Sequence, residues 1–543
     1  MLFKQVKKIW DMASKEEKVG MTFENEAGIV LSEEIDIKTF RNKKSLADFL
    51  TQKGIQTSAG DDIIQNIYDI YANADRIWTV PQTGWVAEAS TPTFVTPAET
   101  FGDQAYRLKK DPIAKETFSH HGKFDAWKAA LNLITGSPIL MYSIGIALAA
   151  LVKGLLEIEA SFGFYIYGKS SIGKTTCLRL AQSVQDNPAN HNTWDITKGG
   201  IEECCFEHNS SLMVLDELRQ ISNNDRRLCE AVRDASYAIS QGKARKRCHG
   251  YAAQMGFQEG SWNLIWLGSG EFSLHEMART QNVELYKGQE VRMIEISAFY
   301  SKEYGIFKSL PEGETDSGTV IAKIEKIIKD NYGLLARKWI KKVTEYPNFQ
   351  VVFHEKYDKA FKHIAGHFEC QGGFLERMVR NICLPLTALI MASEMGLVTW
   401  TEAEIMKMGR TITRRALKNI DPTTIELKDM KTLQKKLLHS PSEKLSPRLY
   451  ESKSELEQSI NDGVIYKDKG NYLLPFRVFS QWFGTEAYAK SVETTLKQQK
   501  LVLKGKEGYG QYTLGNQNCR IRMMSINLSD LKKRIEELEK DRS

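Results

Sequence analysis

A glycine-rich segment in the first half of the chain carries the residues best suited to hold phosphate. The sequence GKSSIGKTT fits the pattern GxxxxGK[ST] and lies between the apolar run Gly163–Tyr167 and the helix-like CLRLAQSV. Glycine lets the backbone curl so that successive N–H groups face the phosphates, and the following helix adds its positive N-terminus. The pattern predicts that ATP binds at Gly168, Lys169, Ser170, Ser171, Ile172, Gly173, Lys174, Thr175 and Thr176.

Two residues of this loop have distinct expected roles. Lys174 should reach the β and γ phosphates, and the Thr175 hydroxyl should ligate a magnesium ion. The alternative is a glycine turn with an exposed lysine, but the strand-like run before it and the helical run after it favour the phosphate site.

An acidic pair follows the next strongly apolar segment. In SSLMVLDELRQ, four apolar residues end in Asp216 and Glu217, which is the pattern of a buried strand that delivers carboxylates at its carboxyl end. Ligands of α/β sheets bind at that end of the strands. We expect Asp216 to hold magnesium through water and Glu217 to polarise the attacking water, which together make ATP hydrolysis possible. A pair of surface acids is the alternative.

Further candidates come from later segments. SWNLIWLGSGE ends in a strand-tip serine, Ser269, which is expected to sense the γ-phosphate or the water unless it only forms a turn. KGQEVRMIEIS places Arg292 at the start of a strand, where an arginine of a ring ATPase can enter the neighbouring subunit's site. Arg279 and a structural salt bridge remain alternatives. Arg377 and Arg380, one helical turn apart, are candidates for a lid arginine that reaches ATP.

The candidate residues must be positioned by helices and strands of a folded domain. The chain of 543 residues is long enough for several such domains. The order of helical, apolar and glycine-rich segments around the phosphate pattern predicts an α/β core with a parallel sheet. In the C-terminal part we expect a helix (SELEQSI), one strand (GVIYKDKGNYLL), two helices and a hairpin (LVLKGKEGYGQYTL), which is the order of a winged helix. The expected domains are an N-terminal α+β domain (1–120, a collar or DNA-binding unit), the P-loop ATPase core (121–305), a helical lid (306–430), a linker (431–452), a winged helix (453–526) and a charged C-terminal helix (527–543).

Composition narrows the class of protein. With 42% hydrophobic and 26% charged residues, the chain is neither broadly disordered nor fibrous. Its net charge of +6 is mild, so nucleic-acid binding would have to come from local basic patches. The eight cysteines form no CxxC spacing, which argues against a zinc ribbon and fits a reducing cytoplasm.

No segment indicates a membrane or secreted protein. The first residues, MLFKQVKKIW, lack the apolar core and cleavage site of a secretory signal. The longest apolar stretch, Ile139–Val152, is too short to cross a bilayer core of roughly 30 Å, so we interpret it as a buried helix. We therefore expect a cytoplasmic protein without membrane contact.

Several motifs together resemble a known family, the phage and mobile-element ATPases named domain of unknown function nine-two-seven. The resemblance covers roughly residues 75 to 300, with helical similarity to about 420, and two of its motifs, WDITKGGIEE and GQEVR, go beyond a generic phosphate loop. It runs through GWVAEASTPTFVTPAETFG, YGKSSIGKTTCLRLAQSV, WDITKGGIEE, LMVLDEL, ISQGKARKR, LGSGEFSLHEM and GQEVRMIEISA.

The resemblance implies an AAA+-type fold and a helicase function, since relatives on mobile elements are likened to the MCM replicative helicases. It also implies a homo-hexameric ring, a role in replication of a mobile element, and a primase or other replication proteins as partners. Related replication proteins often carry a primase or zinc-binding module before the helicase, and we find none in this sequence. Primer synthesis by this chain is therefore not expected.

Two basic segments are candidates for contact with single-stranded or forked DNA. The first, ISQGKARKRCHGYAAQ, lies where helicases of this kind insert a hairpin into the ring channel, and the second belongs to the expected winged helix. A solvated loop in the first case and a protein-binding winged helix in the second are the alternatives. The candidates are Lys243, Arg245, Lys246, Arg247, His249 and Tyr251 in the first segment, and Lys490, Lys497, Gln498, Gln499, Lys500, Lys504 and Lys506 in the second.

The leading hypothesis is an ATP-driven DNA helicase or translocase. One rival is a DNA-bound initiator or regulatory ATPase that changes conformation with nucleotide but does not unwind DNA. A second rival is a P-loop kinase that phosphorylates a small molecule, which the large helical lid and the C-terminal module disfavour.

Overall fold

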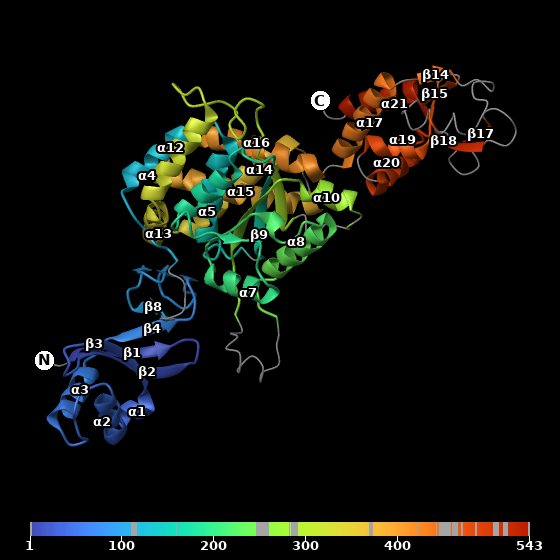
Figure 1. Ribbon diagram of the computed structural model, residues 1–543. Helices are drawn as coiled ribbons and strands as arrows, with labels where there is room; N and C mark the ends of the chain where they lie inside the picture. The colour runs from blue at the N-terminus through green and yellow to red at the C-terminus, as the bar shows by residue number, and fades with distance from the viewer. Residues whose placement is uncertain are drawn as a thin grey trace.

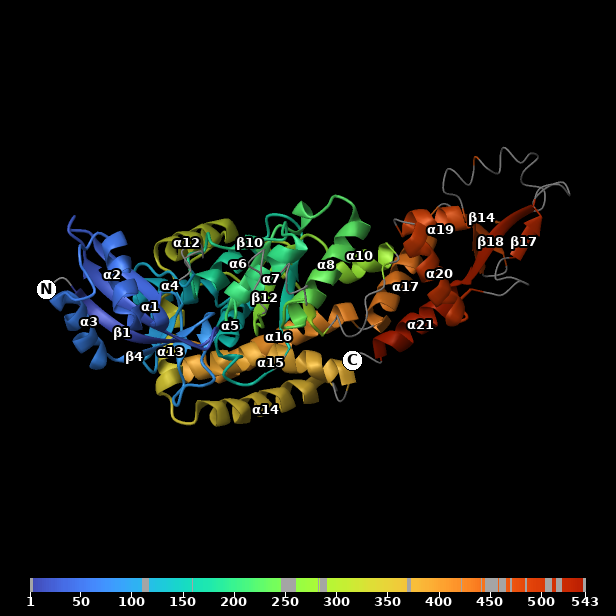
Figure 2. The same cartoon turned by 90° about the horizontal axis from the view of Figure 1, so that it is seen from below.

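The computed structural model has a central body with a smaller module at each end (Figure 1, Figure 2). The N-terminal strands and helices form one end, and the last helices and strands form the other. The residues that the structure describes are 3–109, 117–158, 160–245, 260–281, 283, 291–368, 373–420, 422–440, 442–444, 458, 465–468, 471–483, 486–502, 510–513 and 520–540.

A five-stranded parallel sheet lies at the centre of the body. The phosphate-loop strand β9 lies between β12 and β13, and all neighbouring pairs run parallel, so every strand ends at the same edge of the sheet. Helices cover both faces, which is why the strands are continuous apolar runs. In spatial order the strands are β10 (Asn192–Thr193), β11 (Leu212–Asp216), β12 (Ile265–Gly270), β9 (Phe162–Tyr167) and β13 (Met293–Ser297).

Alternate residues of β11, β12, β9 and β13 enter two separate cores. In β9, Phe164 and Ile166 pack into the larger core, whereas Tyr165 packs into the core on the opposite face. The helices of the first face are α5 (Pro138–Val152) and α6 (Lys174–Ser183), and those of the second are α7 (Lys198–Glu207), α8 (Asp225–Ser240) and α10 (Leu274–Thr280). The sheet is thus the middle layer of an α–β–α arrangement.

Helix α5 is the apolar segment that the sequence analysis interpreted as a buried helix, and the structure confirms this. Every residue from Ile139 to Val152 is buried. Its backbone approaches helix α15 (Gly373–Glu394) closely, because a Cβ added at Gly145 would lie 2.7 Å from the carbonyl oxygen of Pro385. Among the described residues, no helix is both long and apolar enough to cross a membrane.

The helices after the sheet do not form a core of their own. Their apolar faces enter the same core as α5, α6 and β9, so they extend the first helical layer of the body. Figure 2 shows α14 and α15 lying along the body on this side. They are α12 (Ser317–Asp330), α13 (Leu334–Glu345), α14 (Phe349–Phe368), α15 (Gly373–Glu394) and α16 (Glu402–Ile420), with α4 (Phe124–Ile134) packed beside α12 and α13.

The N-terminal module is an α+β unit. Its mixed sheet has the order β3-β2-β1-β4-β8, and α1, α2 and α3 pack on one face of it around Phe23, Phe40 and Leu50. The elements are β1 (Phe3–Asp11), β2 (Glu16–Glu24), β3 (Val30–Asp36), α1 (Ile37–Arg41), α2 (Lys43–Gln52), α3 (Asp62–Ala72), β4 (Arg76–Val80) and β8 (Tyr106–Leu108). A three-stranded sheet of β5 (Gly84–Trp85), β6 (Phe94–Val95) and β7 (Thr100–Phe101) lies between β4 and β8 in the chain.

The C-terminal module differs from the expected winged helix in its strands. GVIYKDKGNYLL is not one strand but two, β15 and β16, which pair antiparallel with Asp468 opposite Asn471. Asp468 and Asn471, which border the reversal, are both of residue types that favour turns. Strand β17 pairs with β18, so RIRMMSIN supplies a strand that was not predicted from the sequence. The elements are β14 (Ser442–Lys444), β15 (Ile465–Asp468), β16 (Asn471–Leu474), α19 (Phe476–Trp482), α20 (Glu486–Gln498), β17 (Gly510–Thr513), β18 (Arg520–Asn527) and α21 (Leu528–Lys540).

The boundary of this module also needs correction. Helix α17 (Pro422–His439) runs through the start of the expected 431–452 linker, and Leu433 and Leu437 of this helix belong to the C-terminal core. The charged C-terminal helix α21 packs into the same core through Leu531 and Ile535. Both helices are amphipathic, and their apolar faces are buried against each other and the module's sheet. The helix SELEQSI lies outside the described residues apart from Gln458.

A buried lysine lies at the amino end of the central sheet, opposite the phosphate loop. The Lys153 side chain follows α5 and donates to the carbonyl oxygen of Ile158 at 2.8 Å and to Oδ1 of Asn263. The Asn263 N–H donates to Asn209, whose side-chain amide donates to the Thr83 carbonyl of the N-terminal segment at 2.8 Å. Burial lowers the pKa of Lys153 to about 7.

This burial predicts a pH dependence of stability. The pKa of a lysine in the unfolded chain is about 10.4, so between pH 7 and 10 the unfolded state binds more protons at Lys153 than the folded state does. The free energy of unfolding should therefore rise with pH, by up to about 1.4 kcal/mol per pH unit from this group. Lys153→Met should lack this contribution, so the difference in unfolding free energy between wild type and variant should grow in favour of wild type from pH 7 to 10. Chemical unfolding at each pH measures it, and parallel profiles would contradict the prediction.

Candidate active site

The phosphate loop connects the end of β9 to the start of α6. Gly173 has φ +100°, and a Cβ at this position would lie 3.0 Å from Cγ2 of Ile306, so both the backbone and the space favour glycine. Helix α6 begins directly afterwards at Lys174, and the first N–H groups of a helix have no partner within it. These N–H groups and the curled loop form the kind of cradle that binds phosphate.

Lys174 lies folded over this loop. Its side-chain nitrogen donates to the carbonyl oxygens of Gly168 and Lys169, at 2.8 Å in both cases. Burial lowers the pKa of Lys174, while the nearby carboxylates of Glu271 and Asp216 act in the opposite direction. The lysine, half-buried with acidic groups close by, is thus placed at the mouth of the loop.

Asp216 and Ser269 meet at the same edge of the sheet. Asp216 is the last residue of β11 and is 4% exposed, and its Oδ1 accepts hydrogen bonds from the Ser269 hydroxyl at 2.5 Å and the Glu217 N–H at 2.9 Å. The parallel register of β11 and β12 explains the contact, because Leu215 pairs with Gly268 and the next residues are Asp216 and Ser269. The Gly270 carbonyl then accepts the N–H of Gly168, the first loop residue, at 3.2 Å.

Glu217 leaves the strand in an unusual conformation. Its φ of +57° and ψ of +58° lie in the left-handed region, which is uncommon for residues other than glycine. The exposed side chain accepts a hydrogen bond from the Gln220 amide in the turn that follows. Glu217 therefore lies beside Asp216 with an exposed carboxylate, as a residue that polarises water requires.

The oxygen ligands available at this edge suit magnesium. Thr175 is exposed at the first turn of α6, and Oδ2 of Asp216 accepts no hydrogen bond from the described residues. Hydroxyl and carboxylate oxygens are the hard ligands that magnesium prefers, together with phosphate oxygens and water. The two residues named in the sequence analysis as metal ligands thus fit the ion chemically.

Arg292 lies at the opposite edge of the sheet. Its carbonyl accepts the N–H of Gly163 at 2.8 Å, whereas the loop begins after Tyr167 at the other end of β9. At about 3.3 Å per residue, the two edges are on the order of 15 Å apart. The guanidinium lies 5.4 Å from the ring centroid of Tyr237, which is 47% exposed. Arg292 therefore faces the molecular surface and not the phosphate loop of its own chain.

The structure does not bring Arg377 and Arg380 to the phosphate loop. Arg380 is ion-paired with Glu376 at 3.1 Å and stacks on Phe361 of α14, with its guanidinium carbon 4.0 Å from the ring centroid. The next residue, Asn381, donates to the carbonyl that precedes Arg292, so this turn of α15 lies beside the other edge of the sheet. The prediction that Arg377 or Arg380 reaches the ATP of its own chain is therefore wrong. The one-turn spacing of the two arginines does not reveal which way that face of the helix points.

A different arginine of the same helical layer reaches the loop edge. Arg415 of α16 donates to the carbonyls of Ser297 and Phe299, at 3.0 and 2.9 Å, and stacks on Tyr300 at 3.5 Å. It fixes the segment that follows β13. Arg415 could not be recognised as such from the sequence, because RRALKNI has the pattern of an ordinary basic helix face.

The expected DNA contacts are only partly within the described residues. Lys243 and Arg245 are exposed at the root of the basic segment, where Lys243 pairs with Ser261 and Arg245 lies 3.7 Å from Glu202. In the C-terminal module, Lys490 and Lys500 are exposed, and Lys497 is ion-paired with Glu493 at 2.6 Å. The other basic and aromatic candidates, namely Lys246, Arg247, His249, Tyr251, Lys504 and Lys506, lie outside the described residues.

The fold is of the α/β class, with a parallel central sheet, and it resembles the fold of a solved helicase structure. Residues 5–253 match the family described as Domain of unknown function (DUF927), so this chain contains a DUF927 domain. The resemblance drawn from the sequence motifs is thereby confirmed.

Solved structures extend the likeness over the whole chain. The structure titled "SCCmec type IV Cch - active helicase" covers 98% of this chain and 95% of its own, with a TM-score of 0.57 and 14% identity. This likeness concerns the fold. The NrS-1 C-terminal region (TM-score 0.27, 12% identity, 74% of this chain and 90% of that one) and the ADP form of Aeropyrum pernix ORC2 (0.20, 12%, 72% and 90%) are too distant to carry an argument. No curated protein matches the chain.

The different positions of Lys174 and Glu217 predict different defects. Lys174→Ala should abolish nucleotide binding or turnover, because the phosphates lose their main cationic partner. Glu217→Gln should still bind ATP, yet hydrolyse it about 10²-fold more slowly or worse, since only water activation is lost. Equilibrium binding of a fluorescent ATP analogue and phosphate release measure the two effects. Glu345→Gln, on the exposed face of α13, is the matched control and should change neither. Loss of binding in Glu217→Gln would contradict the assigned role.

Proposed function

We propose that this chain is an ATP-dependent DNA helicase or translocase that works as a homo-hexameric ring in the replication of a phage or another mobile genetic element. The observation that carries the proposal is the convergence of Lys174, Asp216, Glu217 and Ser269 at one edge of the parallel sheet. The whole-length fold likeness to the Cch helicase, and the DUF927 match, support the helicase class and the mobile element.

ATP hydrolysis follows from the roles of these residues. The loop N–H groups and Lys174 would hold the phosphates, and Glu217 would orient and polarise the attacking water. Magnesium, when bound, neutralises the charge that develops on the phosphate oxygens, and Thr175 and Asp216 would hold it. Ser269, fixed to Asp216, would sense the γ-phosphate from the neighbouring strand.

The position of Arg292 supports a ring. This arginine is at the sheet edge opposite its own loop, and its side chain lies beside the exposed ring of Tyr237. In a ring, that surface would face the neighbouring subunit's nucleotide, where a fixed guanidinium stabilises the transition state. Each active site would then take one residue, Arg292, from the next chain.

Mixing of inactive subunits tests the role of Arg292 in the adjacent site. Arg292→Ala should bind ATP normally and hydrolyse it up to about 10³-fold more slowly. Combined with Lys174→Ala subunits, it should regain some ATPase activity, because some sites pair an intact loop with an intact neighbouring arginine. Rings that form from both variants but recover no activity at any ratio would contradict the assignment, once titration with wild-type subunits has excluded a ring whose sites must all act together.

The proposal of DNA binding depends first on the basic residues at the start of the 243–261 segment. Lys243 and Arg245 are exposed there, and cations of this kind neutralise backbone phosphates without reading sequence. The C-terminal module offers a second surface through Lys490 and Lys500. Because α20 of that module packs against α10, the helix after the turn that follows β12, DNA held there would lie close to the segment that follows Ser269.

Strand displacement on a forked duplex distinguishes a helicase from an initiator ATPase. We expect displacement that requires ATP and is absent in Lys174→Ala, whereas an initiator would show DNA-stimulated hydrolysis without displacement. Neutralising Lys243, Arg245, Lys246 and Arg247 together should weaken displacement and flatten the salt dependence of DNA binding. The log–log slope should fall by roughly 0.7 for each phosphate of a single strand that the variant no longer neutralises.

The matched control for the basic segment replaces four exposed basic residues elsewhere, Lys4, Arg41, Lys341 and Lys359, which lie in the N-terminal module and on α13 and α14. Basal ATP hydrolysis should survive in both quadruple variants. Equal loss of displacement in the two would show that overall charge matters and not the segment.

A further inference from the structure

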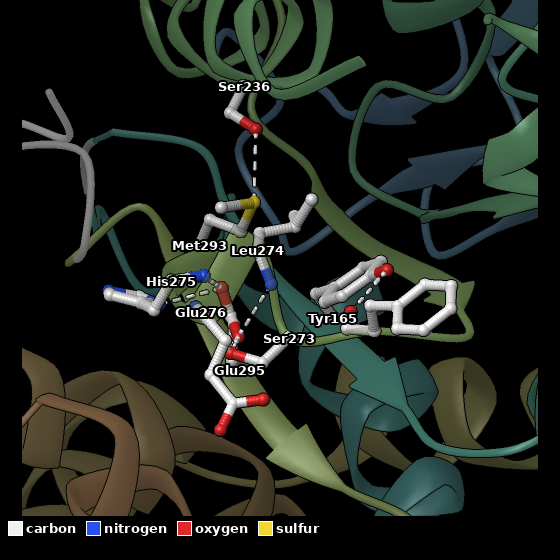
Figure 3. Close-up of polar contacts among 9 residues, drawn as sticks. Tyr165, Ser236, Ser273, Leu274, His275, Glu276, Met293 and Glu295 are labelled. Carbon is white, nitrogen blue, oxygen red and sulfur yellow. Dashed lines mark hydrogen bonds and ion pairs between the residues drawn. The ribbon is translucent and has the colours of Figure 1, made fainter. Parts of the chain in front are cut away.

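A fully buried carboxylate lies in β13, away from the phosphate loop. Glu295 is 0% exposed, and each of its two oxygens makes two polar contacts. Oε2 accepts from the Ser273 hydroxyl at 2.7 Å and the Leu274 N–H at 3.1 Å, and Oε1 accepts from the His275 N–H at 3.0 Å and contacts Nδ1 of the same ring at 2.6 Å. Figure 3 shows these three residues converging on the Glu295 side chain.

All four contacts of Glu295 fall on one short segment, residues 273–275. Burial of a carboxylate is costly unless hydrogen bonds or an opposite charge compensate it, and here the contacts with Ser273, Leu274 and His275 provide the compensation. An apolar side chain would fill this place in β13 without that cost. The arrangement therefore serves to hold residues 273–275 in one position.

Residues 273–275 follow closely in the chain after Ser269, a residue of the candidate active site. Ser269 and Gly270 end β12, and the chain then passes through Glu271 and Phe272 to reach Ser273. The Phe272 carbonyl accepts a hydrogen bond from the Tyr165 hydroxyl of β9 at 3.1 Å. The turn after Ser269 is thus fastened to two strands of the sheet, to β9 directly and to β13 through Glu295.

We propose that Glu295 is a positioning residue for ATP hydrolysis, which acts by fixing the turn after β12 so that Ser269 keeps its contact with Asp216. The inference rests on the proposed ATPase function. Glu295 touches no nucleotide, so its loss should impair the chemical step and leave ATP binding, which depends on the loop and Lys174, largely unchanged.

Glu295→Gln is the primary test, because it keeps the shape but presents an amide group to donors that require an acceptor. We expect kcat to fall by about tenfold or more, with the affinity for an ATP analogue changed by less than about twofold. The milder Ser273→Ala variant, which removes one of the four contacts, should lower kcat in the same direction and is available if the first variant folds poorly.

A matched control separates positioning from general destabilisation. Gln185 is 3% exposed and, like Glu295, satisfies backbone groups, those of Leu212 at the far end of β11 from Asp216, at 2.7 and 3.0 Å. Gln185→Met should lower Tm by a comparable amount while kcat of the folded enzyme stays unchanged. If both variants lose kcat alike, Glu295 has only a structural role and the proposal is overturned.

A double-mutant cycle tests whether Glu295 acts through Ser269. If it does, Glu295→Gln combined with Ser269→Ala should be no slower than Ser269→Ala alone. Multiplicative losses would overturn the proposal.

Hydrogen exchange gives a readout that does not depend on turnover: Glu295→Gln should accelerate exchange at Leu274 and His275 and leave α5 unchanged. Unchanged exchange at both residues would overturn the positioning role, whereas a wild-type chain without ATP turnover would contradict the proposed function itself.

Discussion

The hydrogen bond between Ser269 and Asp216 depends on the parallel register of three strands. Because β11, β12 and β9 run in the same direction, their carboxyl ends meet, and residues from distant parts of the sequence become neighbours. An antiparallel or shifted β12 would carry Ser269 away from both the acid and the loop. The helices on the two faces bury the strands and so keep this register, which is why the two apolar cores matter to the site as much as the loop does.

The two edges of the sheet have different chemistry. The carboxyl edge has exposed and half-buried polar residues, such as Glu217 and Lys174, that remain available for a ligand. At the amino edge, Lys153, Asn263 and Asn209 bond to one another or to backbone carbonyls, and they connect the body to Thr83 of the N-terminal segment. The carboxyl edge therefore offers groups that can bind and react with a ligand, whereas the amino edge connects the central body to the N-terminal segment.

The elements that could be predicted from the sequence are those whose structure is determined by a few consecutive residues. The phosphate loop, the acidic strand end and the buried helix α5 each depend on a few consecutive residues, and the structure has these elements where the sequence placed them. Glu295 was not foreseen, because in MIEIS it looks like the solvent-facing residue of an alternating strand, and its donors come from a separate segment. The pairing of β17 with β18 was missed for a similar reason, since alternation does not identify a strand's partner. The direction in which Arg380 points was set by Glu376 and Phe361, which spacing cannot reveal.

The separation of Arg292 from its own phosphate loop by the length of β9 has a consequence for control of the enzyme. Under the proposed role, a lone chain would hold ATP without hydrolysing it, and only a neighbour would complete the catalytic centre. Turnover would then rise more steeply than linearly with protein concentration in the range where subunits associate. Dilution would act as an off-switch, so that a few newly synthesised copies would not drain cellular ATP before enough of them had gathered at one place on the DNA.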